Sequence, residues 1–430
     1  MNDRLCPALL VSAPASGQGK TSVTAALARW HRRQGRVVRV FKTGPDFLDP
    51  TVLERASGAL VYPLDMWMGG EEDVRARLYA AAGEADLILI EGVMGLFDGS
   101  ASSADLAMRL GIPVLAVIDG SAMAQTFGAV ATGLARYREG LQVYGVTANR
   151  VGSDYHAQLL AGSLPSDLTW LGALPRDPAM ALPERHLGLV AASEQDDLEH
   201  RLDALADAWA AHAQDRLPSP ARFVEVVLPP VERLLEGRRI AVARDAAFCF
   251  IYAANLDVLR QSGAQIAFFS PLAGDALPPC DAVWLPGGYP ELHLAALARN
   301  ARLRDALHRH VDTGKPLLAE CGGMLYSLDA LTDRDGVAYP MAGLLQGQAA
   351  MQARLSGLGM QSVQLPEGDL RGHAFHYAKA QITPSPLALT INPDGGPTRE
   401  GVYRRQRMTA SFMHLYFPSN ATAAMSLFLP

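Results

Sequence analysis

The sequence has no hydrophobic run long enough to span a bilayer, no surplus of basic residues and no closely spaced cysteines. Its N-terminal apolar stretch is too short and too soon interrupted for a signal peptide. A net charge of −6 at pH 7 leaves no excess cation to neutralise a nucleic-acid backbone. The 4 cysteines lack CxxC or Cys/His ligand spacing, which disfavours a zinc site and a disulfide framework. We therefore expect a cytoplasmic protein with neither a membrane nor a nucleic-acid partner.

What the sequence does contain is apolar residues in short, spaced runs. They make up 49% of the 430 residues, which is enough for packed cores, and the length suggests two domains. Short apolar runs alternate with helix-length segments, a pattern that predicts a parallel sheet with crossover helices. In the first half these runs are ALLVSA, RVVRVFK, ADLILIEG, PVLAVID, VYGVTANRV and LTWLGALP.

A change of pattern separates the two halves of the chain. Residues 192–237 carry a charged helical segment, EQDDLEHRLDALADAWAAHAQD, and then sequence that prolines interrupt. Beyond it the runs RRIAVARD, AQIAFFS, CDAVWLPGG and KPLLAEC are again typical of buried strands. We therefore predict an α/β protein with two tandem doubly wound domains, at residues 1–225 and 238–430, joined by a linker at 226–237.

A predicted phosphate-binding loop follows the first strand. The segment PASGQGKT stands between LLVSA and a helical segment. Gly17 and Gly19 allow backbone N–H groups to turn toward phosphates. Lys20 supplies a positive charge, and Thr21 can place its hydroxyl on Mg²⁺. The first position of the pattern is proline instead of glycine, so the alternative is a glycine-rich connection with an incidental lysine. The strand–loop–helix context favours the nucleotide site.

Carboxylates at strand ends are candidates for the same site. Asp46 and Asp49 follow the run RVVRVF, and Glu91 and Asp98 follow LILI. The carboxyl ends of parallel strands face the ligand crevice, where Mg²⁺ takes carboxylate oxygens and water. Each acid alone would more often be a turn or capping residue. Together with the loop, they predict a metal and substrate cluster.

A candidate nucleophile lies in the second half. Cys321 stands between the strand PLLAE and the segment GGMLY, at a turn of the kind that exposes a nucleophile. The start of a helix also favours the thiolate. The alternative, a small buried hydrophobic residue, suits Cys6 and Cys249 better. Gly288 ends another strand, and its N–H could form an oxyanion hole with that of Gly322.

Eleven ordered segments in both halves carry a family resemblance. They are APASGQGKTSVT, FKTGPDFLDP, LIEGVMGLFDG, NRVGSDYH, GALPRD, PERHLGLV, ARDAAFCF, LPGGYPELH, AECGGMLY, RGHAFHY and SFMHLYF. This set resembles the cobyrinic acid a,c-diamide synthases of cobalamin biosynthesis. The C-terminal half is similar to a class I glutamine amidotransferase domain, and the N-terminal half to the nucleotide-binding fold of dethiobiotin synthetase.

The resemblance implies a reaction. ATP, with Mg²⁺, would phosphorylate the a- and c-side-chain carboxylates of cobyrinate or hydrogenobyrinate. Ammonia, added as such or released from glutamine, would then displace phosphate from each acyl phosphate. The implied partners are a corrinoid substrate, glutamine and ATP, and a homodimer fits the family.

The resemblance also implies roles for single residues. It makes Cys321 the nucleophile and His414, in the segment SFMHLYF, its general base and acid. The other implied positions are Lys20, Thr21, Asp46 and Glu91 for nucleotide and magnesium, Asp49 and Asp98 for substrate, and Asn149 for adenine.

Two departures from the family pattern concern the second domain. Leu-Tyr follows His414 where many class I glutaminases have a glutamate two residues on, so we expect a Cys–His dyad. Ala374 stands in RGHAFHY where relatives often have a larger polar residue, and the roles of His373 and His376 stay open.

Two other functions compete with this interpretation. One is a cobyric acid synthase, which amidates other carboxylates of the same ring; the combination of ERHLGLV with KTGPDFLDP favours the diamide synthase. The other is a phosphate-loop switch ATPase with an inert glutaminase-like domain, which the retained Cys321 disfavours.

Overall fold

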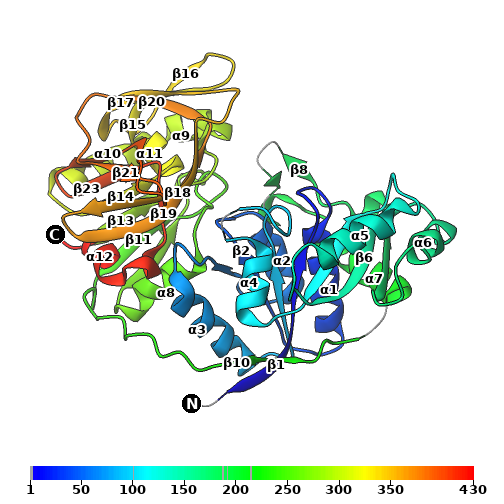
Figure 1. Ribbon diagram of the computed structural model, residues 1–430. Coiled ribbons are helices and arrows are strands. Elements are labelled where there is room, and N and C mark those ends of the chain that lie inside the picture. The colour runs from blue at the N-terminus through cyan, green and yellow to red at the C-terminus, as the bar shows by residue number, and fades with distance from the viewer. Residues whose placement is uncertain (1–2, 100, 186–187, 191, 214–215) are drawn as a thin grey trace. The chain divides into compact units, whose positions relative to one another are not determined.

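Two compact units make up the chain (Figure 1). The computed structural model describes residues 3–99, 101–185, 188–190, 192–213 and 216–430. The first unit comprises Met1–Met66 and Glu71–Leu228, and the second comprises Trp67–Gly70 and Pro229–Pro430. The change of unit after Leu228 falls inside the linker expected at 226–237.

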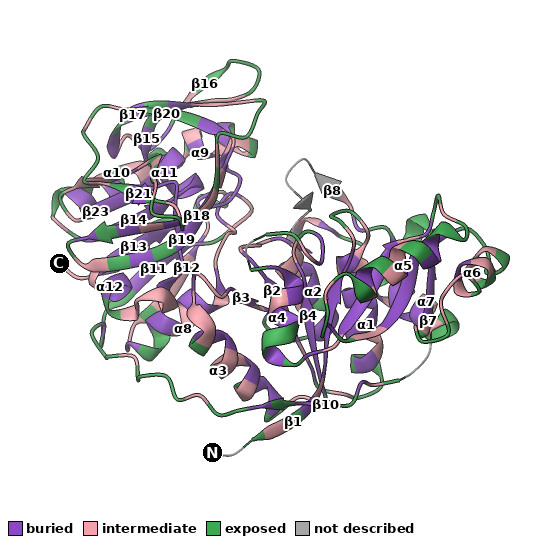
Figure 2. Ribbon diagram, in the orientation of Figure 1, coloured by how far each residue is buried: buried purple, intermediate pink, exposed green. Residues whose placement is uncertain are grey.

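A parallel sheet forms the centre of the first unit, as the alternating runs predicted. Its strands are rich in Val, Ile and Leu because both faces are covered by helices (Figure 2). In spatial order they are β3 (Tyr62–Leu64), β2 (Val38–Thr43), β4 (Leu87–Glu91), β1 (Arg4–Ser12), β5 (Val114–Asp119), β6 (Val143–Val151) and β7 (Trp170–Pro175). One further strand, β10 (Pro220–Phe223), pairs antiparallel with the start of β1.

Helices connect these strands. From β1 to β3 the chain adds strands toward one edge of the sheet, and from β3 to β7 it adds strands toward the other edge. Because crossover connections between parallel strands are right-handed, this change of direction places helices on both faces of the sheet. Helices α1, α2 and α7 contact one another. The helices of this unit are α1 (Lys20–Arg33), α2 (Asp49–Ser57), α3 (Gly70–Ala82), α4 (Ser103–Leu110), α5 (Thr126–Arg136), α6 (Asp154–Ala161) and α7 (Leu198–His212).

The charged segment before the linker is helix α7, as predicted. It belongs to the first unit and packs on α1, where Arg29 lies 2.8 Å from Asp203 and 2.9 Å from Glu199. Just before it, β8 (Glu184–Arg185) and β9 (Gly188–Leu189) pair with each other. Residues 186–187 of the segment PERHLGLV lie outside the described residues.

The second unit contains a larger, mixed sheet. Its parallel part carries the four strands predicted from the sequence, and β23 extends it. In spatial order the strands are β12 (Gln265–Phe269), β11 (Arg239–Ala243), β13 (Ala282–Leu285), β14 (Leu317–Glu320), β23 (Met408–Ser411), β22 (Pro397–Arg405), β21 (Ala388–Ile391), β18 (Gly357–Leu365), β19 (Gly368–His376) and β24 (His414–Leu415).

Antiparallel pairing from β23 to β24 departs from a wholly doubly wound sheet. The physical reason is the short connections: only Pro366 and Glu367 separate β18 from β19, and such a hairpin forces antiparallel strands. A second small sheet comprises β16 (Ala338–Pro340), β15 (Leu328–Thr332), β17 (Leu345–Met351) and β20 (Ala378–Ile382). The α/β class holds, while the parallel pattern covers only part of this unit.

Helices of the second unit connect mainly the parallel strands. They are α8 (Ala253–Gln261), α9 (Leu294–Arg299), α10 (Ala301–Asp312), α11 (Gly322–Ser327) and α12 (Ala421–Ser426). Across the described parts of both units, no helix has the length and apolar character needed to cross a membrane.

Candidate active site

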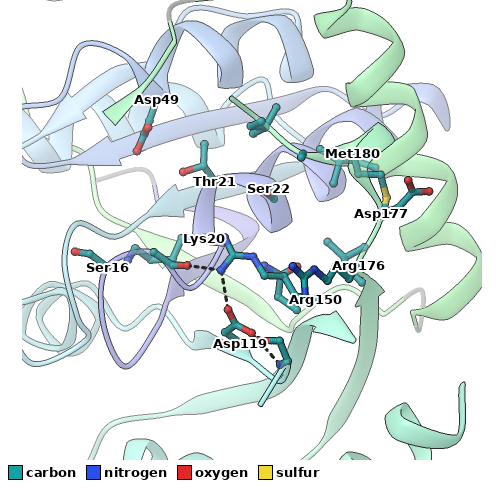
Figure 3. Close-up of a pocket in the computed structure, with 18 of the residues that line it drawn as sticks. Ser16, Lys20, Thr21, Ser22, Asp49, Asp119, Arg150, Arg176, Asp177 and Met180 are labelled. Carbon is teal, nitrogen blue, oxygen red and sulfur yellow. Dashed lines mark hydrogen bonds and ion pairs between the residues drawn. The ribbon is translucent and has the colours of Figure 1, made fainter. Parts of the chain in front are cut away.

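A cavity of about 910 Å³ lies at the carboxyl ends of the parallel strands in the first unit (Figure 3). The phosphate loop, the end of β2 and the ends of β5 to β7 contribute its walls. The sequence-predicted residues that line it are Gly17, Gly19, Lys20, Thr21, Asp46, Asp49 and Asn149. Folding therefore brings together, at this cavity, residues that are more than 130 positions apart in the sequence.

The phosphate loop turns directly into α1. Gly19 has φ of 92° and precedes the first helical residue, Lys20; this left-handed conformation costs least for glycine. Nζ of Lys20 donates hydrogen bonds to the carbonyls of Ala15 (3.2 Å) and Met94 (2.6 Å). Burial, and then the neighbouring Lys42, lower the pKa of Lys20. The ammonium is therefore held at the loop by backbone oxygens.

Asn149 supports the loop from the end of β6. Its Nδ2 donates to the carbonyl of Gln18 at 3.0 Å. A Cβ added to Gly19 would lie 1.9 Å from that nitrogen, so the close approach itself requires glycine. The next residue, Arg150, donates to the carbonyl of Gly17 at 3.0 Å and pairs with Asp119 at 2.7 Å (Figure 3). The adenine-reading role of Asn149 stays a prediction.

A buried charge cluster occupies the ends of β2 and β4. Nζ of Lys42 lies 2.6 Å from Glu91, 2.6 Å from Asp49 and 3.6 Å from Asp46. Oγ1 of Thr21 donates to Oε1 of Glu91 at 2.9 Å. The two predicted strand ends, together with the phosphate-loop threonine, thus meet in one place, as the sequence indicated.

The cluster shifts the pKa of each of its members. Burial and the charge of Asp49, acting against Lys42, raise the pKa of Glu91 to about 7 and that of Asp46 to about 6. Lys42 outweighs burial at Asp49 and lowers the pKa of that carboxyl. The carboxylates outweigh burial at Lys42, whose pKa lies well above its ordinary value.

One atom in this cluster lacks a partner among the described residues: Oε2 of Glu91, which is fully buried. An unpaired buried carboxylate oxygen beside a hydroxyl suits a hard cation. Within the described residues, no three His, Cys, Asp or Glu side chains converge as a ready metal cluster. Mg²⁺ needs only one or two carboxylates, because water and phosphate oxygens complete its shell.

Asp98 lies apart from the cavity wall. Its Oδ2 accepts the N–H of Gly95 at 2.8 Å, which closes the turn after β4. Several side chains at the cavity were given no role from the sequence, among them Lys42 and Arg150. Lys42 had a signal: it stands at the end of a predicted strand, directly before the segment that carries both aspartates. Arg150 had none beyond its place after Asn149.

In the second unit, Cys321 forms a strained turn between β14 and α11. Its φ of 45° is unusual for a residue other than glycine. Its backbone N–H donates to the carbonyl of Ser411 at 2.7 Å, and Sγ lies 4.0 Å from the carbonyl oxygen of Phe375. The turn has the predicted strand-to-helix setting.

Glycines let the neighbouring segments approach this turn closely. A Cβ on Gly322 would lie 3.0 Å from the backbone nitrogen of Gly288, and one on Gly287 would lie 2.2 Å from Cε1 of His414. The backbone of the two predicted oxyanion residues, Gly288 and Gly322, is therefore adjacent. The imidazole of His414 lies against Gly287, the residue before Gly288.

His414 lies on β24, a strand of two residues at the edge of the mixed sheet. It is the β-sheet partner of His373 on β19, and the two rings stack with centroids 5.0 Å apart. Nδ1 of His373 lies 3.2 Å from the hydroxyl of Tyr252. Tyr416, where other glutaminases have glutamate, is buried and packs on Tyr252.

Burial favours the uncharged forms of Cys321 and His414. It raises the pKa of the Cys321 thiol far above its usual range, and the carboxyl of Glu291 adds to this. It lowers the pKa of His414 well below 6.5 and that of His373 to about 3. The ground state therefore contains a thiol and a neutral imidazole.

His376 is held in a different way. Its Nε2 lies 2.8 Å from Glu400, and its ring stacks on Phe412 with centroids 3.8 Å apart. Ala374, between the two histidines, is fully buried, so a larger side chain there would have to displace its neighbours.

Family models match the two units separately. Residues 9–190 match the CobQ/CobB/MinD/ParA nucleotide binding domain, and residues 239–422 match the CobB/CobQ-like glutamine amidotransferase domain. The fold and the two sites thus define a class of protein: a nucleotide-binding domain joined in one chain to a glutamine amidotransferase domain.

Relatives that match over the full length of the chain show which family within this class it belongs to. A hydrogenobyrinate a,c-diamide synthase from Pseudomonas aeruginosa is 58% identical over 100% of this chain and 99% of its own length. Another from Stutzerimonas stutzeri is 59% identical over 100% of both chains. A cobyrinate a,c-diamide synthase from Herminiimonas arsenicoxydans is 48% identical over 98% of this chain and 96% of its own. The chain belongs to the a,c-diamide synthase family.

Family membership confirms several predictions made from the sequence. The family itself, the α/β fold class and the enzyme class, a glutamine-hydrolysing carbon–nitrogen ligase, are as predicted. The same evidence disfavours a switch ATPase with an inert second domain.

Proposed function

We propose that the chain amidates the a- and c-side-chain carboxylates of hydrogenobyrinate, with ATP and glutamine as co-substrates, in cobalamin biosynthesis. The observation that carries this proposal is the 58% and 59% identity, over the full chain, to two relatives named for that reaction. Cobyrinate is the second candidate, because a relative named for it is 48% identical. The alternative is amidation at other positions of the ring, as in a cobyric acid synthase; none of the three relatives described above is named for that reaction.

Glutamine hydrolysis belongs to the second unit. Sγ of Cys321 attacks the side-chain amide carbon of glutamine while His414 takes the thiol proton, since both groups start uncharged. The N–H groups of Gly288 and Gly322 stabilise the oxyanion. His414 gives the proton to the leaving nitrogen, which releases ammonia and a thioester. Water then hydrolyses the thioester to glutamate and restores the thiol.

Carboxylate activation belongs to the first unit. The phosphate loop, with Gly17, Gly19 and Lys20, holds the ATP phosphates, and Asn149 lies at the end of the strand where we expect the adenine. A ring carboxylate attacks the γ-phosphoryl group, which gives an acyl phosphate and ADP. Ammonia then displaces phosphate, so each cycle converts one carboxylate into one carboxamide.

Thr21, Asp46 and Glu91 fit a magnesium ion. Mg²⁺, when bound, neutralises charge on the transferring phosphoryl group. The hydroxyl of Thr21 and the unpaired Oε2 of Glu91 support this placement. Asp49 and Asp98 are the acids that we assign to substrate handling. Asp49 lines the cavity, whereas Asp98 acts through the turn that it closes.

We place this reaction in the cytoplasm and expect a homodimer, as in the family resemblance. The four cysteines are free, and none has the spacing of a disulfide framework, which supports a reducing compartment.

Two variants test the division of labour. Cys321→Ala should abolish glutamine hydrolysis and glutamine-dependent synthesis, yet retain synthesis from added ammonium. Lys20→Ala should abolish amide formation with either nitrogen source, because the carboxylate is no longer activated. Normal turnover by the Lys20 variant, or loss of ammonium-dependent synthesis in a folded Cys321 variant, would contradict two separate half-reactions.

A further inference from the structure

Glu320, the residue directly before the nucleophile, points into the protein and has no role in the chemistry above. Its side chain is 2% exposed. Oε1 accepts the backbone N–H of Leu415 at 2.8 Å, and Oε2 accepts Nε1–H of Trp284 at 2.7 Å. A buried carboxyl group with an N–H donor on each oxygen is a specific arrangement, since burying a polar group without partners is costly.

The bond to Leu415 matters because of where β24 lies. In the order of the mixed sheet it is the last strand, so one side of its backbone faces no further strand. Leu415 directs its N–H and C=O to that side, while the N–H of Tyr416 donates to the carbonyl of Arg371 on β19. Edge-strand groups buried in this way need side-chain partners.

Two buried side chains supply those partners. Glu320 accepts the N–H of Leu415, and Nδ2 of Asn255 donates to the carbonyl of Leu415 at 2.8 Å. Oδ1 of Asn255 also accepts the N–H of Phe417 at 2.8 Å. Of the two, only Glu320 is adjacent in sequence to the cysteine.

The contact therefore joins the residue before Cys321 to the residue after His414. At the same turn, the N–H of Cys321 donates to Ser411, three residues before His414. Nucleophile and base come from segments more than 90 positions apart. The bond between Glu320 and Leu415 links these segments within one residue of each reacting side chain, and the bond from Cys321 to Ser411 adds a second link.

We infer that Glu320 is a positioning residue of the glutaminase site, which sets the placement of His414 relative to Cys321 through the backbone of Leu415. It takes over part of the orienting task that a carboxylate at position 416 performs in other glutaminases, without touching the imidazole. The inference rests on the proposed roles of Cys321 and His414.

Glu320 acts by holding the backbone of Leu415 in place, and not through its charge. Burial raises the pKa of Glu320 to about 8, and the two donated N–H bonds oppose that shift. Charge on Glu320 raises the pKa of the Cys321 thiol, so an electrostatic role would hinder thiolate formation. Removing the carboxyl group should therefore impair proton transfer because the base is misplaced, even though it removes one cause of the raised pKa of the Cys321 thiol.

The experiment compares three variants of the full chain. Glu320→Gln keeps the volume but can accept only one of the two N–H groups, because its amide nitrogen is itself a donor. Glu320→Ala removes both bonds. Trp284→Phe is the matched control, since it removes the bond to Oε2 and leaves the link to Leu415.

The measurements are kcat and KM for glutamine hydrolysis, ammonium-dependent amide formation, and the rate at which a glutamine-like diazoketone alkylates Cys321. We expect Glu320→Ala to lower kcat on the order of 10²-fold and Glu320→Gln about tenfold, as for a misplaced base. KM for glutamine should change less than about twofold. Alkylation should slow in parallel, ammonium-dependent synthesis should persist, and Trp284→Phe should lose less than either Glu320 variant.

Two outcomes overturn the inference. One is a kcat of folded Glu320→Gln within about twofold of the unaltered chain. The other is an equal loss in Trp284→Phe, which would indicate general loosening of the core. If Glu320→Ala does not fold, the kcat of Glu320→Gln alone tests the inference. Cys321→Ala separates this inference from the proposed function: glutamine hydrolysis by that variant would remove the nucleophile assignment itself.

Discussion

Lys42 and Glu91 are direct partners in the register of β2 and β4, and their side chains meet with Nζ 2.6 Å from Oε1. Both side chains are buried. The pair follows from strand register, because each residue lies at the carboxyl end of a parallel strand, which faces the same crevice. Lys42 thus neutralises the carboxylates that we propose for magnesium and substrate.

Replacing Lys42 should therefore destabilise the first unit. Lys42→Met leaves buried carboxylates without their cation, which typically costs about 3–5 kcal/mol. Urea unfolding measures the loss in free energy, and Mg²⁺ should restore more stability to the variant than it adds to the unaltered chain. The control is Lys42→Met with Glu91→Gln, which removes both partners and should recover part of the loss. A single-variant change below about 1 kcal/mol would contradict the account.

A side chain at Gly19 should block nucleotide binding. In Gly19→Ala the new Cβ meets Nδ2 of Asn149 at 1.9 Å, and φ of 92° adds strain. Gly17→Ala is the matched control: its φ of 76° costs about 1–2 kcal/mol, but its Cβ meets nothing within 4 Å. Titration with ATP should show at least about tenfold weaker binding in Gly19→Ala than in Gly17→Ala. Equal affinities would mean that the loop does not pack on Asn149.

The hydroxyl of Thr21 should set the magnesium requirement. Thr21→Val removes the donor to Glu91 and a candidate ligand while it keeps the shape, and Thr21→Ser keeps the hydroxyl. We expect Thr21→Val to need about tenfold more Mg²⁺ for half-maximal ammonium-dependent synthesis, and Thr21→Ser to behave like the unaltered chain. Identical magnesium curves for the two variants would place the ion elsewhere.

Glu320 should make the protein less stable as the pH rises. Its pKa is raised from 4.5 to about 8 in the folded state, so the folded form binds a proton that the unfolded chain loses at lower pH. Its stabilising contribution is present below pH 4.5 and is lost as the pH rises through about 8. In Glu320→Gln the drop in melting temperature between about pH 5 and about pH 8.5 should be smaller.

Glu367 is the control for this pH series. Although burial raises its pKa, Arg404, a partner at 2.8 Å, lowers it below the ordinary value. Its contribution is lost only as the pH falls, so Glu367→Gln should lower the melting temperature without changing the drop between about pH 5 and about pH 8.5. If Glu320→Gln and Glu367→Gln alter that drop equally, burial of Glu320 does not cause it.

The sequence predicted the parallel strands because their signal is local. Each is a short apolar run, and the strand–loop–helix setting of Lys20 and the strand–turn–helix setting of Cys321 follow from neighbouring residues. The antiparallel strands after Leu345 carry alternating polar residues and hairpin turns, whose pairing depends on partners distant in sequence.

The same reason explains the missed residues. Lys42 and Glu320 stand inside quoted motifs, but their roles depend on a strand partner and on Leu415, which only the folded chain reveals. Asn149 is a residue that the sequence did single out, but its observed contact differs from the expected one. The resemblance gave it a role toward the nucleotide, while its contact with Gln18 shows a role toward the loop.

The identity of the product tests the central claim most directly. The chain is incubated with ATP, Mg²⁺ and glutamine, with hydrogenobyrinic acid in one reaction and cobyrinic acid in another, and the products are measured by mass. The account predicts that hydrogenobyrinate gains two amides and no more, with one ATP consumed for each amide, and that it is converted faster than cobyrinate. More than two amides on the ring, or no ATP-dependent amide on either ring, would contradict it.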